Sequence, residues 1–170
     1  MTADQPTLRE FQQKLTDRLN AAEQSSVPPA LLAMESGKDR WLLDLADAGE
    51  VVPTPPLAAV PLTKPWYAGL ANVRGNLFSV VDLSRFHGGE PTARDADSRL
   101  LLVGTRHGIN SALLVTRVLG LKSLATLEIE SAPDQQSWRG DRFRDAQGTH
   151  WTQLRIPQLL KARTFLEIGR

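Results

Sequence analysis

The 170-residue chain contains no cysteine, which excludes disulfides, thiolate chemistry and zinc sites built from cysteine. It also contains no apolar run close to the roughly 18 residues that a membrane-spanning helix needs. Its first ten residues, MTADQPTLRE, do not show the basic stretch followed by an apolar stretch that marks a secretory signal. We therefore expect a cytoplasmic protein that is not inserted in a membrane.

An excess of one charge is missing as well. Twenty basic residues stand against nineteen acidic ones, and the formal net charge is +1. A dedicated polyanion binder normally has a clear basic excess, so nucleic acid is not an expected partner.

Residues arranged for catalysis are scarce. None of the three histidines (His87, His107 and His150) has a second histidine or a carboxylate at the spacing of metal ligands. His87 and His107 each precede a glycine, which favours exposed turn positions. The chain has no nucleophile-elbow, Walker or dinucleotide-binding glycine motif. We expect no enzymatic activity, no metal site and no cofactor.

The segment from about Thr7 to Ala22 predicts an amphipathic helix. An apolar stripe recurs at three- and four-residue spacing, and Thr7 with Glu10 fits a capping box. The stripe consists of Leu8, Phe11, Leu15 and Leu19. This stripe must dock on the chain's own domain or on a partner. The first is favoured, because so short a helix is only marginally stable alone. Residues 25–29 then predict a linker, so the helix and linker together occupy residues 1–29.

Beyond Pro29 the pattern is that of strands. Short apolar runs alternate with turns rich in glycine and proline, and five prolines between residues 53 and 65 predict an extended surface connection. Residues 88–98 and 131–148 predict polar loops, and residues 157–162 a single helical turn. The predicted strands are 30–35, 40–45, 51–52, 77–83, 100–103, 109–118 (one strand or a pair), 122–130 and 150–156. This pattern predicts an all-β protein of small-barrel or sandwich type.

Two less favoured functions also deserve a test. Residues 138–144 mix three arginines with Trp138 and Phe143, a combination that binds nucleic acid in some small barrels, although Asp141 and Asp145 dilute its charge. An acid–base pair of Asp44 and Asp82 would suit an enzyme. Nothing in the sequence brings those two carboxylates together.

The most informative stretch is residues 66–83, WYAGLANVRGNLFSVVDL. Two glycines permit tight backbone, and a single arginine, Arg74, stands between apolar segments. Such an arginine can satisfy carbonyl groups, pair with a carboxylate or serve as an exposed interface anchor. Physical reasoning alone leaves these three roles open.

At these residues the sequence resembles the CheW family, the adaptor proteins of bacterial chemosensory arrays. The family pattern is matched by residues 69–75 (GLANVRG) and 80–83 (VVDL). The resemblance covers about residues 30–162 and is strongest over 41–83. It is weaker at residues 115–118, where the family's aspartate is absent. Residues 64–67 and 165–169 resemble the adaptors of type IV pilus (twitching motility) systems.

The resemblance implies a CheW-like domain over residues 30–168, with two intertwined five-stranded SH3-like barrels. The first barrel would take residues 30–95 plus the C-terminal segment, and the second residues 98–156. Family members have no catalysis and no cofactor. They bridge the regulatory domain of a CheA-type histidine kinase to the cytoplasmic tip of a chemoreceptor, at the periphery of membrane-associated arrays.

The resemblance also implies which residues contact partners. The expected interface residues are Ala48, Glu50, Gly69, Asn72 and Arg74. The expected lining of an apolar groove between the barrels is Val51, Val52, Leu70, Val115 and Val118.

Overall fold

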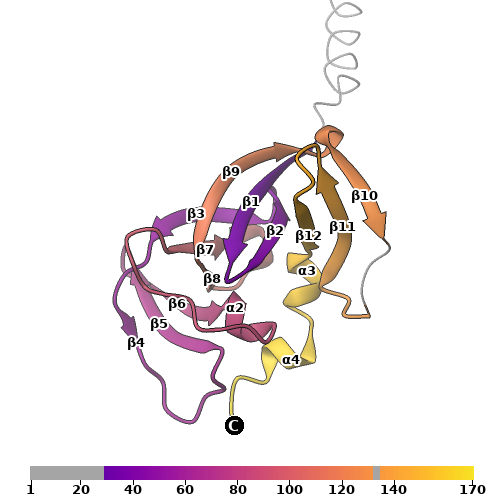
Figure 1. Cartoon of the computed structure of the whole chain (residues 1–170). Helices are drawn as coiled ribbons and strands as arrows, with labels where there is room; N and C mark the ends of the chain where they lie inside the picture. Colours follow the sequence, from indigo (N-terminus) through magenta and orange to yellow (C-terminus); the bar gives the residue numbers. More distant parts are fainter. Residues whose placement is uncertain (1–28, 132–134) are drawn as a thin grey trace, which may run out of the picture.

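The computed structural model describes residues 29–131 and 135–170, which form short strands joined by turns and brief helical segments (Figure 1). In chain order the elements are β1 (Ala30–Ser36), β2 (Asp39–Asp44), β3 (Ala48–Pro53), β4 (Leu57–Ala58), β5 (Tyr67–Val73), β6 (Asn76–Asp82), α2 (Leu83–Phe86), β7 (Arg99–Val103), the 3-10 turn η1 (Thr105–His107), β8 (Ser111–Val115), β9 (Arg117–Ser123), the 3-10 turn η2 (Leu124–Thr126), β10 (Leu127–Ser131), β11 (Arg139–Asp145), β12 (His150–Leu154), α3 (Ile156–Leu159) and α4 (Arg163–Leu166).

The strands form two six-stranded sheets. Sheet A has the order β10-β11-β12-β2-β1-β9, and sheet B has the order β3-β7-β8-β6-β5-β4. The predicted all-β class is therefore confirmed, with six strands in each sheet where five were expected. The strands are also divided differently from the predicted barrels. The first two strands leave the N-terminal half and pair with β9 and, in parallel, with β12.

Strand β1 shows why the first two strands take interior positions in sheet A. Its side chains alternate between the two faces of the sheet. Leu31 and Ala33 belong to a cluster within sheet A, whereas Leu32 and Met34 belong to the large cluster that the two sheets share. A strand that is buried on both faces reads as a continuous apolar run. The run LLAM in the sequence fits this interior position.

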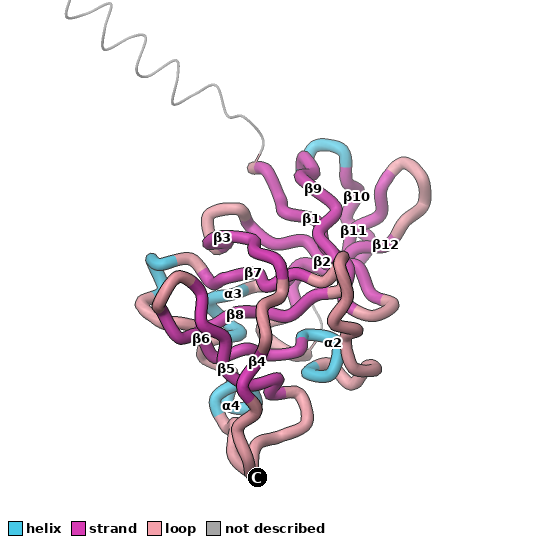
Figure 2. The backbone as a smooth tube through the Cα atoms, turned by 90° about the vertical axis from the view of Figure 1, so that its left-hand side faces the viewer, coloured by secondary structure: helices cyan, strands magenta, loops and turns pink. Residues whose placement is uncertain are grey.

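The shared cluster holds the two sheets together. It combines residues of sheet A with residues of sheet B, such as Leu101 and Leu113, while sheet B also has a smaller cluster of its own. In Figure 2, sheet A lies above sheet B, and α2 lies beside the strands of sheet B. Short helical segments seal the shared cluster through Leu83, Ile156 and Phe165. Burying each of these large side chains contributes about 1.5–3 kcal/mol.

The structure describes the C-terminal segment of the chain but not the first 28 residues. The helix and linker expected over residues 1–29 lie outside the described residues, except for Pro29. The helical turn predicted over residues 157–162 is confirmed as α3, with Pro157 in its first turn, and a second turn, α4, follows it. The last residues then return to sheet B, where the amide of Lys64 donates to the carbonyl of Ile168 at 2.8 Å.

The described part of residues 131–148, which begins again at residue 135, is not the polar loop that was predicted. The segment contains β11, which pairs with both β10 and β12. Trp138 and Phe143 are each only 4% exposed. In its pairing with β12, β11 carries a bulge between Arg139 and Arg142, which interrupts the two-residue alternation that identifies a strand. The single strand predicted over 122–130 is likewise divided, by η2, between β9 and β10.

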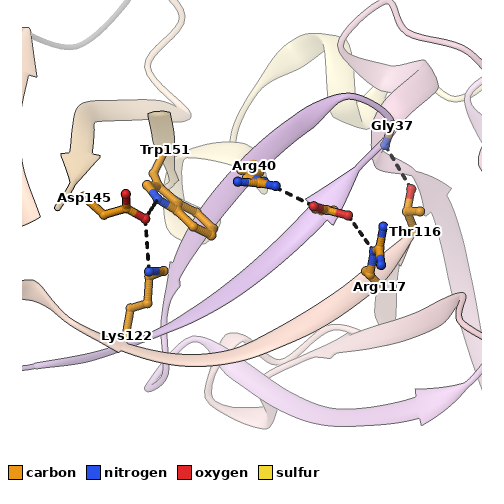
Figure 3. A network of polar contacts seen from close by, with 8 residues as sticks. Gly37, Arg40, Thr116, Arg117, Lys122, Asp145 and Trp151 are labelled. Carbon is orange, nitrogen blue, oxygen red and sulfur yellow. Dashed lines mark hydrogen bonds and ion pairs between the residues drawn. The ribbon is translucent and has the colours of Figure 1, made fainter. Parts of the chain in front are cut away.

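Polar contacts tie the edge strand β9 to the rest of sheet A (Figure 3). On one side, Arg117 donates to the carboxylate of Glu35 on β1 at 2.6 Å. On the other side, Lys122 donates to Asp145 at 3.2 Å, and the indole N–H of Trp151 donates to the same carboxylate at 2.9 Å. Asp145 therefore links β9 with β11 and β12.

Asp145 should make the stability of the domain sensitive to acid. Burial alone raises the pKa of a carboxyl, but hydrogen bonds from Trp151, the Thr149 amide and Lys122 outweigh burial and hold the pKa of Asp145 far below its ordinary value. Since the folded pKa is the lower one, the stabilisation is complete above the ordinary carboxyl pKa of about 4 and is lost as the pH falls below it.

Asp145→Asn should therefore lower the thermal unfolding midpoint at pH 7, and the difference from the parent chain should shrink steadily between about pH 5 and pH 2. Circular dichroism melts across this range measure the effect. Asp141→Asn is the control, because Asp141 lies 3.9 Å from its partner Arg155 and both side chains are partly exposed. An equal offset at pH 7 and pH 3 would contradict the role given to Asp145.

Candidate functional site

The hairpin between β5 and β6 presents Arg74 at its tip. Arg74 and Gly75 both have positive φ values, +52° and +86°. Two consecutive positive φ values are typical of the type I′ turn, which matches the twist of antiparallel strands. The side-chain oxygen of Asn72 accepts the amide of Gly75 at 2.8 Å. Asn72 therefore fixes the turn that displays Arg74.

Arg74 and Glu50 form an exposed charge pair that bridges this hairpin and β3. The two terminal guanidinium nitrogens donate to the two carboxylate oxygens at 2.7 and 2.5 Å, the bidentate geometry that arginine favours. The Arg74 side chain is 73% exposed and that of Glu50 43%. The hydrogen bonds to Glu50 and its negative charge raise the pKa of Arg74, so the guanidinium stays charged. The pair offers a partner a preorganised set of donors and acceptors.

Ala48 and Gly69 lie further inside. Ala48 is half-buried against the shared cluster and pairs with Val103 on β7. Gly69 is buried, with φ at +126°, and a Cβ built at this position would lie 2.3 Å from the carbonyl oxygen of Ala58. The structure thus gives Gly69 a clear role in the close approach of β4 to β5.

The five residues expected to line an apolar groove do not come together along one open surface. Val52 is buried in the cluster of sheet B, whereas Val115 is fully buried in the shared cluster. The groove prediction is therefore wrong for these two residues, because neighbouring strands cover their side chains. Val51 and Val118 pack partly buried against the shared cluster, and Leu70 is half-buried on β5.

A depression of about 400 Å³ lies beside Glu50, and sequence reasoning missed it. Its apolar walls include Phe78, Leu102 and Ile109, and Ile109 is 41% exposed. No signal in the sequence pointed to it, since Ile109 was expected at the start of the strand predicted over 109–118, whereas β8 begins only at Ser111. Together, the Glu50–Arg74 pair and this depression form what we call the sheet B site.

A buried carboxylate positions the loop that forms one wall of this site. Asp47, whose side chain is 8% exposed, accepts from Arg106 and contacts the Nε2 atom of His107 at 2.9 Å. The His107 side chain is 12% exposed, so the predicted surface position is wrong. The contact joins residues that are 60 positions apart in the chain. Local sequence patterns do not reveal such a pairing.

The other polar groups considered for chemistry have structural roles. The His87 side chain is 7% exposed, not on the surface as expected, and burial lowers its pKa despite Asp39 at 3.5 Å. Asp82 is buried, and both of its oxygens accept hydrogen bonds from Thr92. Asp44 caps a turn by accepting a hydrogen bond from the amide of Ala46.

Within residues 29–131 and 135–170, no three histidine or acidic side chains gather as a metal site would require.

The aromatic side chains of residues 138–144, which were considered for binding nucleic acid, are buried inside the protein. Trp138 stacks on Trp41 with ring centroids 5.9 Å apart, and Phe143 belongs to the cluster of sheet A. Neither ring can stack on a base without unfolding this region. The basic charge is also partly neutralised, since Arg144 lies within 4 Å of Glu128 and Glu130.

Comparison with known proteins places this architecture in a family. The model of the CheW-like domain matches residues 30–163, most of the chain. The chain belongs to the CheW family. The crystal structure of the scaffolding protein TtCheW from Thermoanaerobacter tengcongensis has the same CheW fold, with a TM-score of 0.65 at 19% identity over 76% of this chain and 90% of that one.

Protein PilI from Pseudomonas aeruginosa is 32% identical to this CheW-family chain over 82 residues. The match spans 48% of this chain and 46% of PilI, about half of each protein. As for membrane association, none of the helices in the described part of this CheW-family chain is long and apolar enough to cross a bilayer.

Proposed function

We propose that this CheW-family chain is a non-catalytic cytoplasmic adaptor that couples a chemoreceptor to a CheA-type histidine kinase. Family membership and the TtCheW fold support a scaffolding role. The partial likeness to PilI supports a place in a chemosensory system that controls type IV pili and twitching motility. The adaptor would sit at the periphery of membrane-associated receptor arrays without entering the bilayer.

The observation that carries the proposal is the sheet B site. It combines a depression whose walls include Phe78 with the bidentate Arg74–Glu50 pair, and arginine and aromatic side chains are enriched where interfaces derive their energy. Signalling then requires only that binding of one partner changes the affinity or placement of the other. A coupling free energy of about 1–3 kcal/mol suffices, and no bond is made or broken.

Reversing the charge of Arg74 tests the proposal. Arg74→Glu should weaken binding of the kinase regulatory domain or of the receptor tip about tenfold, because the new carboxylate repels Glu50 and any acidic partner group. Cooperative unfolding should be almost unchanged, since the pair is exposed. Isothermal titration with each purified partner measures the affinity.

A double variant separates the role of the pair from that of its orientation. Glu50→Arg with Arg74→Glu restores an internal charge pair but inverts it. If the partner reads Arg74 directly, the double variant stays as weak as the single one, whereas restored binding would assign the pair a purely supporting role. Unchanged affinity of Arg74→Glu for both partners would remove the pair from the interface.

A further inference from the structure

A second depression, of about 340 Å³, opens on sheet A where β1 begins. Leu31 and Phe143 form its buried floor, Leu124 and Leu127 are half-buried, and Ile129 is 69% exposed. Ile129 lies directly opposite Phe143 in the pairing of β10 with β11. The cluster inside sheet A therefore continues outward to the surface, an arrangement that marks a docking site. We call this depression the sheet A groove.

The chain itself passes this groove. Pro29 is part of its wall, and the next residue, Ala30, pairs with Ser123 beside η2, where β1 starts in Figure 1. The 28 residues that precede Pro29 contain the apolar stripe from Leu8 to Leu19. As a helix this stripe is about 17 Å long. The nine residues between Leu19 and Pro29 can span up to about 30 Å, enough for the stripe to fold back onto the groove.

The charges of the two surfaces are complementary. Two carboxylates, Asp44 and Asp141, stand in the wall of the groove. On a helix, Lys14 and Arg18 border the apolar stripe on one side, three residues after Phe11 and Leu15 respectively. An apolar stripe bordered by cations fits an apolar groove bordered by carboxylates.

We propose that residues 7–22 of this chain dock as an amphipathic helix in the sheet A groove of the same molecule. The tether gives the helix an effective concentration on the order of millimolar, so weak contacts suffice. Docking covers Ile129 and Leu127. The N-terminal segment thereby competes with any partner that would use this end of sheet A.

The absence of native cysteine provides a clean test in the full chain. A Leu15→Cys, Ile129→Cys double variant should form an intramolecular disulfide under mild oxidation at least tenfold faster than the matched pair Asp17→Cys, Ile129→Cys. Asp17 lies two residues further along the chain but on the opposite side of a helix, so the tether is nearly the same and only the face differs. Non-reducing gels separate the monomeric and dimeric products.

Equal rates for the two pairs would overturn the proposal, because proximity would then come from the tether alone. Disulfide-linked dimers in place of monomers would overturn it in favour of a second copy in the groove. An absence of any disulfide would also overturn it, because the helix would then not reach the groove and another protein would be its occupant.

Hydrogen exchange gives an independent readout, since Leu15→Glu in the otherwise native chain should speed exchange at Leu127–Glu130 several-fold. Unchanged exchange would contradict docking.

Discussion

Replacing Gly69 with alanine should lower the free energy of unfolding by about 3–4 kcal/mol, combining backbone strain with overpacking. The φ value of +126° is one that residues with a side chain rarely adopt. The added Cβ would also lie 2.3 Å from the carbonyl oxygen of Ala58. This oxygen belongs to the backbone of β4, so it cannot rotate away. Urea denaturation followed by circular dichroism measures the loss.

Gly75→Ala is the matched control for Gly69→Ala. Gly75 also has a positive φ, +86°, but no atom lies within 4 Å of a Cβ built there. Its cost should be limited to strain, about 1–2 kcal/mol. If the two variants lost the same free energy of unfolding, the contact with Ala58 would contribute nothing to the cost of Gly69→Ala. A stable Gly69→Ala chain that no longer binds its partners would assign Gly69 to the interface.

Asp82→Ala should cost about 3 kcal/mol of stability, because hydrogen bonds to a charged group contribute about 1.5–3 kcal/mol each and their loss strands buried donors. One oxygen accepts the Thr92 hydroxyl at 2.7 Å and the Ser84 amide at 3.1 Å, and the other accepts the Thr92 amide at 2.8 Å. The carboxylate thereby fastens the loop after α2 to the end of β6. Thermal and urea unfolding measure the effect.

Asp44→Ala is the control for Asp82→Ala. Asp44 is half-buried at the end of β2 and accepts the single amide of Ala46. Its replacement should cost about 1 kcal/mol. If the two variants lose the same stability, the buried network around Asp82 contributes nothing beyond an ordinary turn.

Local features of the fold could be predicted because they depend on neighbouring residues. The hairpin of β1 and β2 is an example, with apolar runs on both sides of Gly37, whose φ of +62° suits a tight turn. The tight turn at Arg74 and Gly75 is another, although the exposure of the Arg74 side chain was left open. The family resemblance placed Glu50 and Arg74 at the same interface, but it did not predict that the two side chains form an ion pair.

Features that depend on distant contacts could not be predicted. Strand β11 was read as a loop because the bulge between Arg139 and Arg142 breaks its alternation and its exposed positions are charged. The exposure of His107 was misjudged because its partner, Asp47, lies 60 residues away. Alternation also reveals that β3 has two faces without telling which cluster each face meets. The resemblance assigned Val51 and Val52 to one groove, although they lie against different clusters.

The topology of sheet A determines the order in which the two sheets can form during translation. Sheet B is built from residues 48–115, a continuous stretch that can fold as soon as it has left the ribosome. The hairpin of β1 and β2 must wait for β12, from residue 44 to residue 154, about 110 residues later. At roughly 5–20 residues per second this wait lasts about 5–20 seconds. Until then the hairpin face that carries Leu31, Ala33 and Leu42 lacks the cover of Phe143 and Trp151, although sheet B and β9 are already made. Transiently exposed apolar surface of this kind is prone to aggregation.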